Sequence, residues 1–304
     1  MRFPRTRAMS PALWMAAAAA MVAFTLARPA ARAAPAGQAP ATAGPAAARP
    51  RPSPFVPPQP LDYDDQDGWT SIFAGATLTG WDGNPAVWRV EDGAITAEST
   101  ADHRVGSTHL IWRGGELDDF ELKLEIKLDG DIHSGIAYRS TTDLAGWLGP
   151  SAPRAGGAAA RGPVFQVPAD PRWTLYGPGL DFDADLQMAG NVEERGTTRR
   201  EIAWRGGIVR AAPGVRPRLI GSLGDADALR AFLVPGGWNQ IHIIARGREL
   251  THIVNGHVMA ILIDDDPTFF RARGDIGLQI EQYGAGRVHF RRIWIKDLDG
   301  SGAR

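Results

Sequence analysis

The stretch WNQIHIIARGRELTHIVNGHVMAILIDDDP, residues 238–267, decides the fold. It holds three runs rich in β-branched residues, separated by an Arg-Gly pair at 246–247 and an Asn-Gly pair at 255–256, and it ends at Pro267. Asn and Gly accept the positive φ that tight hairpin turns require, whereas proline cannot continue a strand ladder. The stretch therefore predicts a meander of three antiparallel strands.

The same pattern recurs on both sides of this stretch. Residues 86–99 read as a hairpin around an Asp-Gly pair at 92–93, and only residues 225–234 look helical. Because side chains alternate between the faces of a strand, a core face can be assigned in two strands. Its expected members are Phe120, Leu122, Leu124, Ile126, Leu128, Ile241, Ile243 and Ala245.

Short strands without βαβ alternation, and without a repeat of fixed period, predict an all-β fold. The expected architecture is a sandwich or jelly roll of two antiparallel sheets. We expect most of Trp69, Trp81, Trp88, Trp112, Trp204, Trp238 and Trp294 to fill its core.

The N-terminal quarter has a different composition. Residues 1–33 combine three early arginines, a short apolar run and an Ala-rich exit, which predicts a secretory signal peptide and an extracytoplasmic protein. Residues 34–60 are rich in Ala and Pro and predict a disordered linker. We expect one domain over 61–298, a short tail over 299–304, and no transmembrane segment after signal removal.

Charge and cysteine content exclude several classes of protein. The chain has 33 basic and 34 acidic residues, a formal net charge of −1, and no basic stripe with interleaved aromatics, so no nucleic-acid partner is expected. It has no cysteine, which excludes disulfides, thiolate metal sites and cysteine nucleophiles.

Seven blocks of the sequence, in order from Gly68 to Lys296, resemble the 3-keto-disaccharide hydrolase domain family. These blocks are GWTSIFAGATLTGW, VWRVEDGAI, THLIWRGGELDDFELKLEIKL with SGIAYRS, LDFDADLQMAGNVEERG, IAWRGGIV, GGWNQIHIIARGRELTHIVNG and IGLQIEQYGAGRVHFRRIWIK. The resemblance implies a concanavalin-like jelly-roll sandwich that is exported and acts on oxidised sugars or related glycans.

The first group of candidate site residues lies at 133–139. The family typically has Asn-Ser-Gly where this chain has His-Ser-Gly at 133–135, followed by the Tyr-Arg pair that stands here at 138–139. His133 departs from the pattern and is a candidate base or metal ligand, or else a solvated rim residue. Tyr138 and Arg139 are candidate substrate-binding residues, because the guanidinium offers a planar fork of donors.

The second group is acidic. Asp181, Asp183 and Asp185 share one face if this segment is a strand, which indicates either a solvated face or a cation site. Asp181 and Asp183 match the family's acidic motif and are candidate substrate or divalent-cation ligands. Glu194 matches a family acid and is a candidate catalytic residue, whereas Glu193 stands where the family often has an aromatic residue.

The third group is Gln279 and Glu281. Gln279 matches a residue that the family projects from its sheet, and it is a candidate substrate ligand. Glu281 stands where a histidine is common in the family. If His133 and Glu281 are an exchanged base and partner, the site keeps one imidazole and one carboxylate; if they are unrelated, the chain has kept binding without catalysis.

For a 3-keto glycoside the expected chemistry is elimination, because the C3 carbonyl acidifies the C2 hydrogen. His133 or Glu194 is the expected base, and Glu281 the expected acid. Arg139, Gln279 or a divalent cation on Asp181 and Asp183 would stabilise the enolate.

Two alternatives remain open. One is a non-catalytic carbohydrate-binding module, with the long insertion Leu144–Trp173 reshaping its ligand groove; the other is an extracellular adhesion or scaffold domain, which the linker favours.

Overall fold

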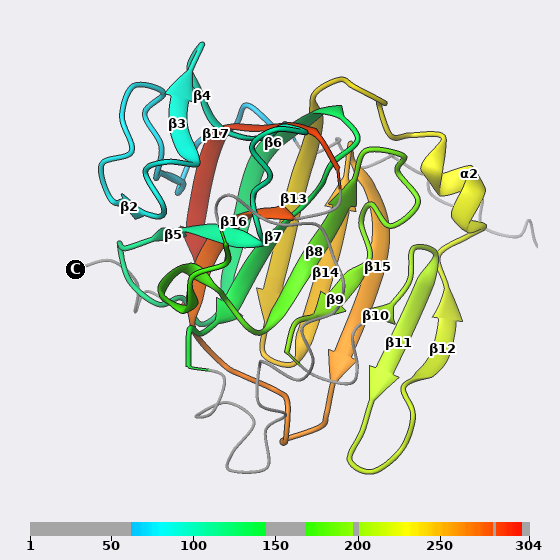
Figure 1. The fold of residues 1–304 in the computed structure, drawn as a ribbon. Coiled ribbons are helices and arrows are strands. Elements are labelled where there is room, and N and C mark those ends of the chain that lie inside the picture. Colours follow the sequence, from blue (N-terminus) through cyan, green and yellow to red (C-terminus); the bar gives the residue numbers. More distant parts are fainter. Residues whose placement is uncertain (1–61, 144–167, 197–200, 282–283, 300–304) are drawn as a thin grey trace, which may run out of the picture. The chain divides into compact units, whose positions relative to one another are not determined.

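The computed structural model describes residues 62–143, 168–196, 201–281 and 284–299. The expected signal peptide and linker, residues 144–167 of the insertion and residues 300–304 of the tail lie outside the described residues. The described chain folds into a jelly-roll sandwich, an all-β fold with two facing sheets (Figure 1).

We call the larger layer sheet A; within the described residues it has ten strands. In sheet order they are β12 (Arg218–Ser222), β11 (Gly207–Ala211), β15 (His257–Asp264), β14 (Glu249–Val254), β13 (Asn239–Arg246), β6 (Phe120–Gly130), β17 (Gly286–Asp297), β4 (Ala94–Ser99) and β3 (Trp88–Glu91), with β1 (Thr70–Ser71) beside β17.

The facing layer, sheet B, has seven strands within the described residues. In sheet order they are β10 (Glu201–Ala203), β9 (Val192–Glu194), β8 (Pro178–Asp183), β7 (His133–Ser140), β16 (Asp275–Glu281), β5 (Thr108–Trp112) and β2 (Trp81–Asp82).

The prediction of antiparallel pairing is confirmed except between β11 and β15, which run parallel. The chain enters β11 from β10 of the other sheet, so no hairpin turn dictates the direction of β11.

The predicted turns carry the expected backbone. Asp92 and Gly93, and likewise Asn255 and Gly256, all have positive φ, as a two-residue turn that matches the twist of its strands requires. The predicted meander is β13, β14 and β15; the register is continuous between β13 and β14, whereas that between β14 and β15 shifts between His252 and Ile253. The turn between β13 and β14 lies at residues 247–248, one residue later than predicted.

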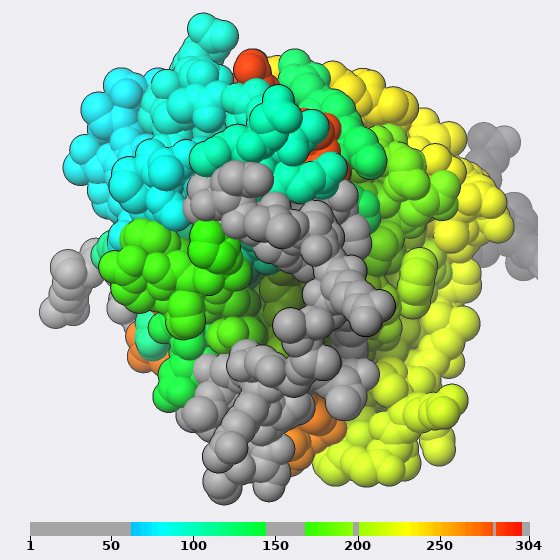
Figure 2. Space-filling view, viewed as in Figure 1, coloured from blue at the N-terminus to red at the C-terminus, as the bar shows by residue number. Residues whose placement is uncertain are grey.

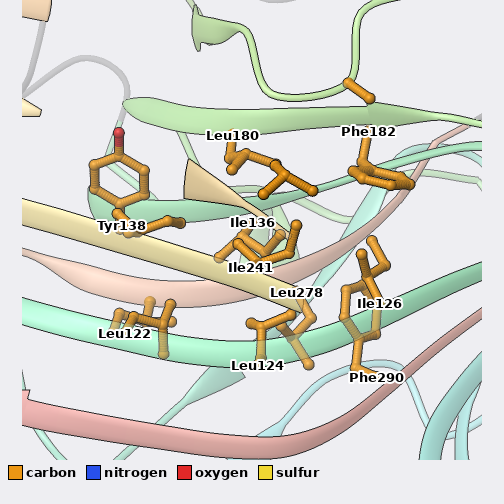
Figure 3. Close-up of a cluster of buried hydrophobic side chains, with 14 of the residues drawn as sticks. Leu122, Leu124, Ile126, Ile136, Tyr138, Leu180, Phe182, Ile241, Leu278 and Phe290 are labelled. Atoms are coloured by element: carbon orange, nitrogen blue, oxygen red, sulfur yellow. The ribbon is translucent and has the colours of Figure 1, made fainter. Parts of the chain in front are cut away.

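The core lies between the two sheets, and the predicted core face of β6 and β13 is confirmed. Leu122, Leu124 and Ile126 are fully buried against side chains of β7, β8 and β16 from the opposite sheet (Figure 3). Phe120 is also buried and packs edge-on against Tyr138 of β7. Each fully buried Leu, Ile or Phe side chain stabilises the fold by about 1.5–3 kcal/mol. The sandwich therefore needs no covalent cross-link.

Two expectations about side elements need correction. The helix α2 spans only Ala226–Arg230, with the Asp225 carboxylate accepting from the N–H groups of residues 227 and 228 as its N-cap. Of the seven tryptophans expected mostly in the core, only Trp81, Trp88 and Trp112 are buried there; three are half-buried (Trp69, Trp238 and Trp294), and Trp204 is exposed where the chain leaves sheet B. A second short helix, η1, spans Pro171–Trp173.

No described helix combines the length and apolar character that crossing a bilayer would take.

Candidate functional site

The candidate site lies on the outer face of sheet B, where polar side chains form a row across four strands. His109 of β5 pairs with Gln279 of β16, Gln279 with Gly135 of β7, and Gly135 with Asp181 of β8. Residues paired in this way project from the same face of a sheet. The inward neighbours of this row, including Leu110, Leu278, Ile136 and Leu180, lie in the core, so the row itself points away from the core.

A second row runs beside the first. Glu281 pairs with His133, and His133 with Asp183. Directly opposite residues have Cβ atoms about 4.5–5.5 Å apart, so the imidazole and the Glu281 carboxylate belong to neighbouring side chains. The two positions at which this chain departs from the expected pattern are thus adjacent in the sheet.

Four carboxylates and one guanidinium gather toward the β8–β9–β10 end of this face. Oxygens of Asp181, Glu193 and Glu201 all lie within 4.8 Å of one another and can hold a metal ion. Arg195 is paired with Glu193 and lies 3.3 Å from a Glu281 oxygen. We call Asp181, Glu193, Glu201, Glu281 and Arg195 the carboxylate cluster; with every carboxylate ionised its formal charge is −3.

Burial makes this charge costly. Desolvation, and then the charge of Glu193, raises the pKa of Asp181 well above its usual range, while Arg195 opposes the rise. For Arg195 burial acts against the charged form, but Glu193, Glu281 and Asp181 outweigh it and raise the arginine pKa. The cluster is therefore a place that accepts protons or a cation.

Three buried polar atoms in the first row have no hydrogen-bond partner among the described residues. They are Asp181 Oδ1, Gln279 Nε2 and His109 Nε2. Leaving a buried polar group unsatisfied costs about 1–3 kcal/mol, so natural proteins reserve such groups for a ligand, an ion or water. All three atoms belong to residues of the row that contains Gly135.

Gly135 keeps the floor of the row open. A Cβ atom there would lie 2.7 Å from the Leu180 carbonyl oxygen and 3.1 Å from Gln279 Oε1. Any larger residue would push the Gln279 amide aside. The glycine therefore sets the position of the amide between β16 and β8.

The backbone after η1 holds His109 in place. Its Nδ1 lies 3.2 Å from the Trp173 carbonyl oxygen and 3.3 Å from the backbone nitrogen of Leu175. Burial, with the charge of Arg195 in second place, lowers the pKa of His109 to about 3. The ring is thus neutral at physiological pH, with Nε2 left for another partner.

Asp183 and Asp185 depart from the predicted acidic row. The strand β8 ends at Asp183, and Asp185 lies in the following turn, where it is exposed. Asp183 accepts from the backbone N–H groups of Gln187 and Met188 at 3.0 and 2.9 Å. Burial, and a hydrogen bond with Asp185, raise the pKa of Asp183 to about 6. Asp183 closes this turn and is not one of the three clustered metal ligands.

Glu194 lies apart from the cluster. In β9 it alternates with Glu193, and its register partner is Pro178, two residues from the core residue Leu180. Burial lowers the pKa of Arg271, and the charge of Glu194 partly opposes that fall. Glu193, not Glu194, is the β9 acid that meets Asp181.

Tyr138 and Arg139 are committed to structural contacts. The buried Tyr138 hydroxyl lies 2.7 Å from His252 Nε2, across the interface between the sheets. Arg139 is also buried; it donates to the carbonyl oxygens of Asp118 and Gly247 and to the Asp119 carboxylate. Both predictions of substrate contact conflict with this geometry, because these donors already have partners.

The sequence interpretation missed four members of the site: His109, Glu193, Arg195 and Glu201. Glu193 was noted only as a departure from the family's aromatic residue, and alternation along β9 would have put it on the face of Asp181. His109 precedes the core residue Leu110 in the same strand, so alternation puts the His109 side chain on the outer face; this is the one local signal that could have indicated it. For Arg195 and Glu201 no local pattern indicates the site.

A second acidic group lies elsewhere, at Asp118, Asp119 and Asp299. Asp119 already accepts from Arg139 and from the backbone N–H of Gly247. Its carboxylate is therefore engaged, unlike Oδ1 of Asp181.

Comparison with known proteins identifies the family. The family model described as a 3-keto-alpha-glucoside-1,2-lyase-like domain matches residues 68–296. No curated protein matches significantly. Similar solved structures include a Parabacteroides distasonis protein assigned as a glycosyl hydrolase (18% identity, 77% of this chain and 95% of that one, TM-score 0.44) and carbohydrate binding module CBM66 from Bacillus subtilis (11%, 71% and 95%, 0.42).

Proposed function

Because the chain belongs to the 3-keto-alpha-glucoside-1,2-lyase-like domain family, we propose that it cleaves the glycosidic bond of 3-keto glycosides by elimination. The observation that carries the proposal is the row of three buried, unpartnered polar atoms on Asp181, Gln279 and His109, which lies next to the carboxylate cluster among the described residues. Such a row is prepared for a polar ligand.

The reaction requires a base, a group that stabilises the enolate and a proton donor for the leaving oxygen. A base removes the C2 proton, and the C–H electrons form an enolate whose negative charge lies on the C3 oxygen. The enolate then reforms the carbonyl, the C1–O bond breaks, and the departing oxygen takes a proton. Addition of water to the resulting C1–C2 double bond completes hydrolysis.

His133 is the base in this proposal. It lies on the same face as the carboxylate cluster, with Glu281 directly opposite in the neighbouring strand. The family commonly has a histidine at the position of Glu281 and an asparagine at that of His133. Because the two positions are adjacent, this chain still has an imidazole beside a polar partner, which favours retained catalysis. Glu194, the other candidate base, projects from the opposite face of its strand.

Gln279 Nε2 supplies a neutral donor for the developing oxyanion, and His109 Nε2 supplies a second in the tautomer whose Nδ1 accepts from the Leu175 backbone N–H. Asp181, Glu193 and Glu201 would hold a divalent cation, which supplies the positive charge that an enolate oxygen requires. This assignment replaces Asp183 as a ligand with Glu193 and Glu201.

The test follows release of the leaving sugar from a 3-keto disaccharide and from its unoxidised parent, with and without added Mg²⁺, Mn²⁺ or Ca²⁺. We expect release from the keto form alone, and more of it with cation. His133→Ala should lower kcat at least 100-fold, the usual effect of losing a general base. Glu194→Gln is the matched control and should leave kcat within about threefold.

Saturable binding of the parent sugar without any release from the keto form would contradict the proposal and favour a carbohydrate-binding module. Loss of activity in Glu194→Gln with full activity in His133→Ala would overturn the assignment of the base. We also propose export, on the signal-like residues 1–33; it is checked by fractionating cells that express the full chain.

A further inference from the structure

The hairpin of β11 and β12, residues 207–222, forms one end of sheet A. It lies at the lower right of the molecule in Figure 1, and Figure 2 shows it as a yellow-green projection on the surface. β12 is the last strand in the sheet order, so its outer edge faces no described strand.

Large apolar side chains gather on this hairpin. Within the described residues six such side chains are exposed; three of them are on the hairpin, Leu219 (70%), Val215 (50%) and Ile220 (49%), and Trp204 (55%) lies just before it. Trp204 stands three residues before β11, and it lines a hollow together with Leu219, Val209 and Pro217. Leu219 and Ile220 are neighbours in β12 and project from opposite faces, so both faces of the hairpin expose large apolar side chains, which indicates an interaction site.

The hairpin is also basic. The segment GIVRAAPGVRPRLIGS contains Arg210, Arg216 and Arg218 and no acidic residue. Arg210 lies 3.5 Å from Asp265, whereas Arg216 and Arg218 are exposed and form no ion pair with any described residue.

The rest of the chain has the opposite charge balance. Residues 1–61 hold 7 of the 33 basic residues and none of the 34 acidic ones, so residues 62–304 have 26 basic and 34 acidic residues. The hairpin is therefore a positive, apolar projection on an acidic domain, and an anionic surface complements it.

Strand pairing with a second copy of the chain is disfavoured. Pro213 and Pro217 flank the turn, the register shifts between Ile208 and Val209, and arginines occupy the edge strand. Proline, bulges and cationic edge residues are the features that prevent edge-to-edge pairing.

We propose that the β11–β12 hairpin binds anionic phospholipid bilayers. Arg216 and Arg218 contact the headgroups, Val215, Leu219 and Ile220 enter the boundary of the acyl chains, and Trp204 lies at the interface. Binding here would hold the site on sheet B at a membrane surface. The proposal is independent of the sugar chemistry, so either can fail alone.

The experiment uses the absence of cysteine. In the full chain, Val215→Cys creates a unique attachment point for an environment-sensitive fluorophore, and Ala76→Cys, on an exposed segment, is the matched control. Each labelled protein is mixed with vesicles of phosphatidylcholine alone or with 30% phosphatidylserine added. We expect a blue shift only for position 215 with anionic vesicles.

Charge reversal tests the arginines. Arg216→Glu with Arg218→Glu should lower the vesicle partition coefficient at least tenfold, roughly fivefold for each basic residue near a charged surface. Raising the salt concentration should also weaken binding. Glycoside cleavage and the unfolding midpoint should not change, because both arginines are exposed and neither belongs to the row of site residues or to the carboxylate cluster.

Several outcomes would overturn the proposal. They are no shift at position 215, an equal shift at position 76, an equal shift with phosphatidylcholine alone, or a shift that appears without vesicles as protein concentration rises. The last result would mean self-association. An equal shift with polygalacturonate in place of vesicles would identify a polyanion site instead.

Discussion

Asp181 is a residue whose expected role in the site comes at a cost to the stability of the fold. Its carboxylate is buried beside Glu193, and Oδ1 has no partner among the described residues. Burial disfavours the charged form, so the folded state pays for ionising this group at neutral pH. A residue kept in this way is expected where a cation or substrate supplies the missing contact.

Asp181→Asn should separate these effects. At pH 7 without cation we expect the free energy of unfolding to rise by about 1–2 kcal/mol, because a repelled buried charge is removed. The stabilisation that Mg²⁺, Mn²⁺ or Ca²⁺ gives to the wild type should disappear. Denaturant unfolding at a series of cation concentrations measures both. Asp275→Asn, also in sheet B but outside the cluster, is the control. A cation response that survives in Asp181→Asn would exclude the proposed ligand set.

Gly135→Ala should impair the site through sterics alone. The added Cβ would meet the Leu180 carbonyl and the Gln279 amide oxygen, so we expect a loss of about 1–3 kcal/mol in stability and displacement of the amide. With 3-keto substrate kcat/KM should fall at least tenfold. Steady-state kinetics on the fraction that remains folded test this. Unchanged kcat/KM would mean that Gln279 does not contact the substrate.

At the scale of the element, β7 divides its residues between two tasks. His133 and Gly135 project from the outer face toward the candidate site, whereas Ile136 and Tyr138 lie in the core with Phe120 (Figure 3). The period of two makes this division obligatory, since neighbouring residues cannot share a face. It also explains why Tyr138 is structural here. Arg139, which has a positive φ near the irregular end of the strand, is instead held by the Asp118 and Gly247 carbonyl oxygens and the Asp119 carboxylate.

Tyr138→Phe should destabilise the fold without affecting the reaction. The tyrosine hydroxyl donates to His252 Nε2, and its loss leaves that buried nitrogen unsatisfied. We expect the free energy of unfolding to fall by about 1–3 kcal/mol and kcat/KM to stay within twofold. Tyr176→Phe, at a half-buried tyrosine, is the matched control and should change stability by less than about 0.5 kcal/mol. A large loss of kcat/KM in Tyr138→Phe would return Tyr138 to the site.

At the scale of the whole molecule, opposing titrations set the response to acid. Burial lowers the pKa of His252 to about 4, so this group is neutral in the folded protein and is protonated near pH 6.5 when unfolded. Its contribution to stability is complete above pH 6.5 and is lost as the pH falls toward 4. Asp183 acts oppositely: its pKa of about 6 in the folded state means that stability falls as pH rises from 4 to 6.

His252→Gln should therefore flatten one part of the stability profile. An amide can still accept from Tyr138 but does not titrate. Between pH 6.5 and 4 the wild type should lose up to about 3 kcal/mol more than the variant. Denaturant midpoints measured across this range provide the test. Parallel curves for the two proteins would show that His252 is not buried in its neutral form.

The fold class and the family could be predicted from the sequence alone. Alternation in β6 and β13 identified the core face, and Asp-Gly and Asn-Gly pairs identified the hairpins, because these signals arise from local backbone geometry. The ordered blocks identified the family. The sequence also identified Gln279, Asp181 and His133 as candidate site residues, but their shared face follows only from the strand registers.

Tertiary structure alone decided how those residues assemble. It brought the carboxylates of Glu193 and Glu201 close to that of Asp181 and placed Arg195 between carboxylates. It also put the Asp183 carboxylate in the turn after β8, and it surrounded the Arg139 guanidinium with hydrogen-bond acceptors. The period of two determines which side of a strand a residue occupies, but not which strands are neighbours or where a strand ends. Charge clusters depend on those two facts, so they became visible only once the sheet order was known.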